Sequence, residues 1–270
     1  MAIPFVRRDA RRGLYWLHHA FAMFRAVPLR WASLIVAYYL IVALAELGPW
    51  PALGKLAASI LKPVFAVGFL AAAWGQDRGR KPSLVDLFRG FRSNLWALLP
   101  LGFVFFVGMT LAAAATALID GGALIAWGAS GEEPSDELVE SGRLQLAMLF
   151  GLACALPTLL ALWFAPALVV FDDAGALTAL ATSLRAALAN WRPVAVLGML
   201  ILFYGGIVPA LGGALARLLD LAAGTVVVLG LLFPYMLVFL ATLQIADYVA
   251  YCDVFHADPA PDGQGPVQAG

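Results

Sequence analysis

Five long apolar runs, none of which contains a charged residue, constrain this chain more than any other feature of its sequence. They are Trp31–Ala45, Leu95–Ile119, Leu144–Phe171, Pro193–Ala216 and Leu221–Ala246. A helix rises 1.5 Å per residue, so about 20 apolar residues cross the ~30 Å hydrocarbon core of a bilayer. The composition agrees, because 63% of the residues are hydrophobic and 13% are charged, whereas soluble domains carry about 25% charged residues. The sequence therefore predicts an all-α, polytopic membrane helix bundle.

A sixth span is predicted at about residues 52–75, although Lys55 and Lys62 interrupt its apolar character. With six spans, both termini and two internal loops share one side of the membrane. Thirteen of the 17 basic residues lie on that side: Arg7, Arg8, Arg11, Arg12, Arg25, Arg30, Arg78, Arg80, Lys81, Arg89, Arg92, Arg185 and Arg192. The positive-inside rule then predicts that both termini lie in the cytoplasm.

The chain reads as three copies of one unit, an amphipathic interfacial helix followed by a transmembrane hairpin. We expect interfacial helices at residues 9–27, 83–93 and 173–190, and spans at residues 29–47, 52–75, 95–119, 143–171, 193–217 and 221–247. In the third interfacial helix the apolar stripe is Leu177, Leu180, Leu184 and Leu188. Residues 1–255 form a single transmembrane domain, and residues 256–270, which lack apolar periodicity, are expected to be disordered.

Several short motifs resemble an uncharacterised family of bacterial six-span inner-membrane proteins. The motifs are Asp86-Leu87-Phe88 with Gly90-Phe91, the run Phe164-Ala165-Pro166-Ala167-Leu168, Asn190-Trp191 with Pro193, and Tyr251 with Asp253 and Phe255. That family is distantly similar to the membrane domain attached to some bacterial glycerophosphodiester phosphodiesterases. The resemblance implies a six-span layout and transfers no activity. It also implies a basic residue before Asp253, where this chain has Cys252.

Candidate chemistry is sparse. No Ser-His-Asp set, glycine-rich phosphate loop or metal-ligand spacing is present, and Cys154 and Cys252 give no disulfide pattern, so we expect no cofactor and no metal. The basic residues lie beside membrane entry points, which indicates contact with anionic lipids or with a partner membrane protein or second copy, and no nucleic acid. The expected lipid or partner contacts are Arg11, Arg12, Arg89, Arg92, Arg185, Trp191 and Arg192.

Two groups of ionisable residues leave alternatives open. Asp247, Tyr251 and Asp253 lie at the cytoplasmic end of the last span. Either Arg89, Arg92, Arg185 or Arg192 pairs with Asp247 or Asp253 and forms a structural clamp, or these residues form a solvated acidic edge. Lys55 and Lys62, with Glu46, are expected near the outer ends of the first two spans. They either snorkel to the interface or mark an ion or proton path.

These features favour a structural or accessory role, in which the interfacial helices bind anionic lipid or a partner subunit. A transporter of small solutes or lipids is the first alternative, because prolines lie in or near five of the six spans and transporters use broken helices to build binding sites. An enzyme of lipid metabolism is the second alternative. It is disfavoured because no acid, base and nucleophile converge at one depth.

Overall fold

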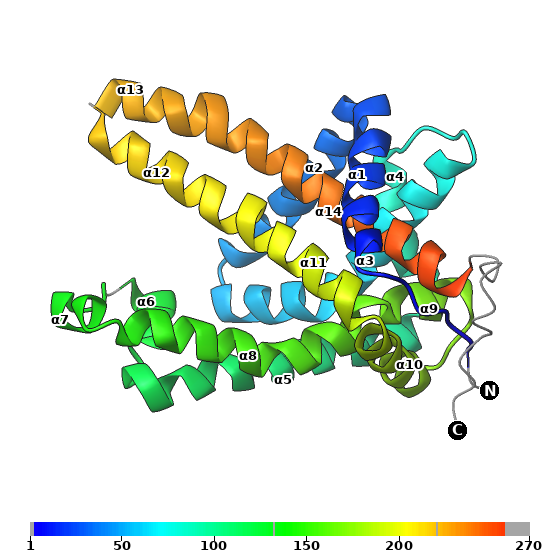
Figure 1. Ribbon diagram of the computed structural model, residues 1–270, viewed down its shortest axis with the longest axis horizontal. Coiled ribbons are helices and arrows are strands. Elements are labelled where there is room, and N and C mark those ends of the chain that lie inside the picture. The colour runs from blue at the N-terminus through cyan, green and yellow to red at the C-terminus, as the bar shows by residue number, and fades with distance from the viewer. Residues whose placement is uncertain (1–2, 132, 220, 257–270) are drawn as a thin grey trace.

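The computed structural model describes residues 3–131, 133–219 and 221–256 of the 270-residue chain. Within these ranges every regular element is helical, and six helices are long and apolar enough to cross a membrane (Figure 1). The fold class predicted from the apolar runs is therefore confirmed. The tail from residue 257 onward, for which disorder was predicted, lies outside the described residues.

The six spans form three hairpins. The first is α2 (Pro28–Glu46) with α3 (Pro51–Asp77), and the second is α5 (Leu95–Asp120) with α8 (Arg143–Trp163) and its continuation α9 (Ala165–Phe171). The third is α11 (Trp191–Leu202) and α12 (Val208–Leu218) followed by α13 (Leu221–Val226) and α14 (Phe233–Phe255). Single π-helical turns, Phe203–Ile207 and Val227–Leu232, join the two halves of each span in the third hairpin.

A shorter helical segment precedes each hairpin. These segments are α1 (Arg11–Ala26), α4 (Leu84–Leu87) with the 3-10 turn Arg89–Arg92, and α10 (Ala176–Ala189). The second segment is thus one turn of α-helix and one of 3-10 helix. The acidic connection of the second hairpin also contains two short helices, α6 (Ala123–Ser130) and α7 (Asp136–Glu140).

Each preceding segment packs on the second span of the hairpin before it. The segment containing α4 packs on α3, and α10 packs on α8. The first helix, α1, has no earlier hairpin, and it packs on α14, the last span of the chain, and on α11 (Figure 1). The three units therefore close into a ring. We call the end of the bundle where Asp77, Phe171 and Phe255 end their helices the basic end, because the arginine-rich segments lie there.

The helix α10 buries its small residues and exposes two leucines of the predicted stripe. Ser183 is 0% exposed, whereas Leu177 is 83% and Leu188 is 56% exposed. The other buried positions of α10 are Ala179, Thr182, Ala186 and Ala187. Small residues let helix backbones approach closely in a membrane, where lipid solvates leucine well. The packed face of α10 is therefore marked by its small residues and not by the leucine stripe.

The segment before the second hairpin is fixed by a buried carboxylate. Asp86 is 1% exposed, and its Oδ2 accepts hydrogen bonds from the Ser83 backbone N–H (2.9 Å), the Ser83 hydroxyl (3.0 Å) and Arg80 Nη1 (2.9 Å). The Nε of Arg89 lies 3.1 Å from Oδ1. This arrangement completes a capping box at the start of α4. Burial raises the pKa of Asp86, but the Arg80 and Ser83 hydrogen bonds outweigh burial, so its pKa lies below the ordinary value.

We expect Asp86→Asn to lower the free energy of unfolding by about 2 kcal/mol at neutral pH, because charge-assisted hydrogen bonds are lost. A lowered folded-state pKa stabilises the fold above the unfolded-state value of about 3.9, and this stabilisation is lost as the pH falls through the folded-state pKa. Thermal unfolding in detergent between pH 7 and pH 3 measures this. The difference in stability between wild type and Asp86→Asn should become smaller below about pH 4. A difference that stays constant over that range would contradict the assignment.

Candidate functional site

The fourth span is broken between α8 and α9, immediately before Pro166. Proline has no backbone N–H and cannot continue the helical hydrogen-bond ladder. The hydroxyl of Ser183 on α10 repairs the break, because it donates to the carbonyl of Leu160 (2.9 Å) and accepts from the N–H of Phe164 (3.0 Å). The buried polar side chain of α10 is thus used to stabilise an interrupted transmembrane helix.

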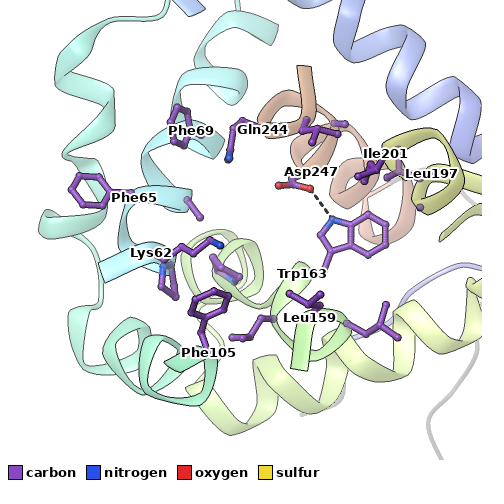
Figure 2. A pocket seen from close by; sticks show the side chains of 18 of the residues that line it. Lys62, Phe65, Phe69, Phe105, Leu159, Trp163, Leu197, Ile201, Gln244 and Asp247 are labelled. Atoms are coloured by element: carbon purple, nitrogen blue, oxygen red, sulfur yellow. Dashed lines mark hydrogen bonds between the residues drawn. The ribbon is translucent and has the colours of Figure 1, made fainter. Parts of the chain in front are cut away.

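A cavity of about 390 Å³ lies beside this break, among α2, α3, α5, α8, α9, α11 and α14 (Figure 2). Most of its wall is aromatic or aliphatic. Five of the lining residues have polar side-chain atoms: Tyr38, Lys62, Trp163, Gln244 and Asp247. Small-molecule sites are typically concave, largely apolar and provided with a few polar groups. The cavity has that character, and it lies inside the membrane-spanning part of the bundle.

Lys62 lies near the middle of α3, about 16 Å along the helix from its first residue. The expected position of Lys62 near the outer end of the span is therefore wrong. The Nζ of Lys62 lies 4.2 Å from the ring centroid of Phe105, a cation–π contact, and its side chain lines the cavity. Lys55, about two turns nearer the outer end of α3, is exposed and does not line the cavity.

Asp247 faces the same cavity from α14, about 12 Å from the basic end of that helix (Figure 2). Its Oδ1 accepts a hydrogen bond of 2.8 Å from the indole Nε1 of Trp163, at the end of α8. Among the described residues no arginine, lysine or histidine nitrogen lies within 4.0 Å of this carboxylate, Lys62 included. The expected pairing of Asp247 with an interfacial arginine is therefore wrong.

Asp253 forms an ionic cluster, but with partners other than those expected. Arg12 binds it with two nitrogens, Nε at 2.8 Å from Oδ2 and Nη2 on Oδ1. The indole of Trp16 donates to Oδ2 at 2.7 Å, and Arg8 Nε lies 3.3 Å from Oδ1. Among the described residues Arg89, Arg92, Arg185 and Arg192 form no contact with Asp253. Arg12, one of the expected lipid or partner contacts, binds Asp253 of the same chain.

The extended segment before α1 strengthens this junction. The backbone N–H of Val6 donates to the carbonyl of Val254 at 2.9 Å. The side chain of Asn190, which is 1% exposed, accepts from the Arg8 N–H at 2.7 Å and donates to the Val6 carbonyl at 3.1 Å. These hydrogen bonds connect the segment before α1 to the last span and to the turn between α10 and α11.

The last span also contacts the ends of the other two hairpins. The Tyr248 hydroxyl donates to Asp77 at 2.9 Å, and the Tyr251 hydroxyl donates to Asp172 at 2.6 Å. Each hairpin thus has an aspartate at the basic end of its second span, and α14 contacts or carries all three. The threefold repeat of the sequence was the signal that could have revealed this set.

The remaining predicted contact residues do not converge on one point. Exposed residues of this set at the basic end are Arg11, Arg89, Arg92, Arg185, Trp191 and Arg192. Trp191 is 60% exposed, with the Arg192 guanidinium 5.6 Å from its ring centroid. Their exposure leaves them available to lipid headgroups or to another protein.

Comparison with known proteins gives one informative result. No protein-family model matches the chain, and no solved structure matches it. The chain is 29% identical over 253 residues to a protein of Burkholderia thailandensis described as a "probable inner membrane protein", with 92% of each chain covered. These comparisons provide no link to glycerophosphodiester phosphodiesterases. The six spans and this similarity together support a multi-pass inner membrane protein built as a helical bundle.

Proposed function

We propose that this protein binds a small, charged, amphipathic solute in the cavity between its three hairpins and moves it across the membrane. The observation that carries this proposal is the placement of Lys62 and Asp247, a basic and an acidic side chain that face one cavity inside the bundle (Figure 2). The mostly apolar wall favours a solute with a hydrophobic part, and the two ionisable groups favour one with both an acidic and a basic group.

Lys62 and Asp247 are energetically costly residues for membrane-spanning helices. A lysine or an aspartate at the centre of a membrane helix costs about 2.5 to 3.5 kcal/mol on insertion scales. Lys62 and Asp247 form no direct ion pair that would offset this cost, and neither lies at the end of its helix. Ionisable residues with these properties typically mark a ligand or ion pathway. A bound solute of matching charge would supply the missing partners.

Three of the spans that line the cavity are interrupted, and the movement of the bundle would take place at these interruptions. Proline follows each of three interruptions: Pro166 after the break in the fourth span, and Pro209 and Pro234 after the two π-helical turns. Broken helices beside a central binding site are typical of secondary transporters. The third hairpin is also the least buried, so it is the part of the bundle with the fewest packing contacts to lose in a movement.

We expect Lys62→Gln to reduce the retained solute at least tenfold, because one charge-assisted contact is worth about 1.4 kcal/mol or more. Native mass spectrometry of protein purified in mild detergent from native membranes measures the retained molecule. The matched control is Lys55→Gln, which removes the same charge from the same helix outside the cavity. Equal retention in wild type and both variants, or no small molecule in any, would contradict a cavity site.

An accessory role is the second candidate, and the exposed arginines with Trp191 at the basic end favour it. A partner subunit or a second copy of the chain could bind there. The resemblance to a membrane domain that is attached to an enzyme in some bacteria is a further reason to test for a catalytic partner. A stoichiometric protein that co-purifies with wild type and with Lys62→Gln alike would favour this role over transport.

A further inference from the structure

A second hollow lies at the basic end, in the junction between the first two hairpins. It has a volume of about 500 Å³ and is formed by α3, by the segment 85–93 and by α9. Among the described residues it shares no lining residue with the central cavity. We call it the basic groove. Its position at the end of the membrane spans makes lipid headgroups its nearest neighbours.

Two arginines give the basic groove its charge. Arg89 is held by Asp86 through Nε alone, and within the described ranges neither its Nη atoms nor the guanidinium of Arg92 has a hydrogen-bonded or ionic partner. Arg80 also binds Asp86. Three arginines and one aspartate leave a local net charge of +2. An arginine oriented by a carboxylate presents its remaining N–H groups as a fork that fits phosphate oxygens.

The deeper wall of the basic groove is apolar. Val67 and Ala71 of α3 are 1% and 8% exposed, and Phe88, Val170 and Phe171 continue the surface. An inorganic anion would leave this part of the groove unfilled. An occupant that satisfies both parts has a phosphate beside the arginines and a hydrocarbon chain along α3 and α9.

From this combination we infer that the basic groove is a binding site for one anionic phospholipid, held by its phosphate on Arg89 and Arg92 and by an acyl chain against α3 and α9. The surrounding bilayer supplies such a ligand at high local concentration, and basic pockets between transmembrane helices bind anionic headgroups in this way. The site joins the first and second hairpins, which also contact each other through α3 and α5.

The test uses nanodiscs of phosphatidylcholine containing one tenth phosphatidylglycerol, followed by native mass spectrometry of the released protein. We expect wild type to retain one phosphatidylglycerol, enriched about tenfold over its share of the bilayer, and Arg89→Gln/Arg92→Gln to abolish this enrichment. The matched control is Arg185→Gln/Arg192→Gln, which removes the same charge from exposed positions outside the groove and should keep the enrichment. Equal losses in the two pairs would show general attraction to the bilayer and overturn the site.

Two further measurements distinguish lipid binding from a folding defect and from the binding of free phosphate. Arg92→Gln alone leaves every contact of Asp86 in place, so it should fold normally and still lose most of the enrichment; unchanged retention in this variant would overturn the proposal. Inorganic phosphate at about 10 mM, a concentration on the order of its physiological level, is added in a second arm. Displacement of the lipid by phosphate would show that the groove binds free phosphate and that the acyl wall contributes nothing.

Discussion

Replacing Asp253 with alanine is expected to reduce the free energy of unfolding by about 3 kcal/mol, the cost of removing one partner from a buried ionic cluster. The Asp253 side chain is 5% exposed, and its loss leaves the guanidinium of Arg8, 14% exposed, and the indole of Trp16 without their carboxylate partner. The junction between α1 and α14 depends on these contacts. Thermal unfolding of the detergent-solubilised protein, together with the yield of folded protein, measures the effect.

The matched control for this variant is Asp173→Asn. Asp173 is an exposed aspartate at the same end of the bundle, and its positive φ of 51° is one that asparagine accepts readily. The free energy of unfolding of this control variant should lie within about 0.5 kcal/mol of the wild-type value. Equal stability of Asp253→Ala and Asp173→Asn would mean that α1 is held by its apolar contacts alone.

Gly102→Ala is expected to destabilise the protein by about 3 kcal/mol, at the upper end of the range for overpacking. A Cβ atom at Gly102 of α5 would lie 1.9 Å from the carbonyl oxygen of Ile60 on α3. The obstacle is backbone, so no side-chain rotation relieves it, and the first and second hairpins would have to separate. The melting temperature of the protein and its sensitivity to protease measure this separation of α5 from α3.

Gly128→Ala provides the comparison. Gly128 lies in α6, and a Cβ there meets no atom within 4 Å, so the change should leave stability unaltered or raise it slightly through helix propensity. If Gly102→Ala and Gly128→Ala had the same melting temperature, the close approach of α5 to α3 would not contribute to the stability of the bundle.

The six spans could be predicted because the thickness of a bilayer fixes the length of an apolar helix, and runs such as Leu95–Ile119 satisfy it without reference to tertiary structure. The packed faces could not be predicted in the same way. In a membrane both the protein-facing and the lipid-facing sides of a helix are apolar, so hydrophobic periodicity does not separate them. In α10, Ser183 and the alanines marked the packed face, and Leu177 and Leu188 marked the lipid-facing one.

The orientation of Lys62 and the partners of Asp253 could not be predicted, for two different physical reasons. A lysine in a span can point to lipid or to the interior, and the sequence of α3 does not distinguish Lys62, which lines the cavity, from Lys55, which does not. The partners of Asp253 escaped for a different reason, because Arg12 lies 241 residues away in the chain. The sequence pattern singled out Asp253 and Arg12 but not Asp77 or Asp172, and only the closed arrangement of the three units decides which residues contact these aspartates.

The closure of the ring by α1 sets the order in which this protein can be completed during synthesis. The ribosome delivers α1 first, yet its docking surface on α14 emerges last, after every other span has been made. Until then the indole of Trp16, fully buried in the finished protein, has no hydrogen-bond acceptor in Asp253. A chain that ends before α14 therefore keeps the packing of α1 on α11 but lacks the contact between Trp16 and Asp253, which forms only once α14 has been made.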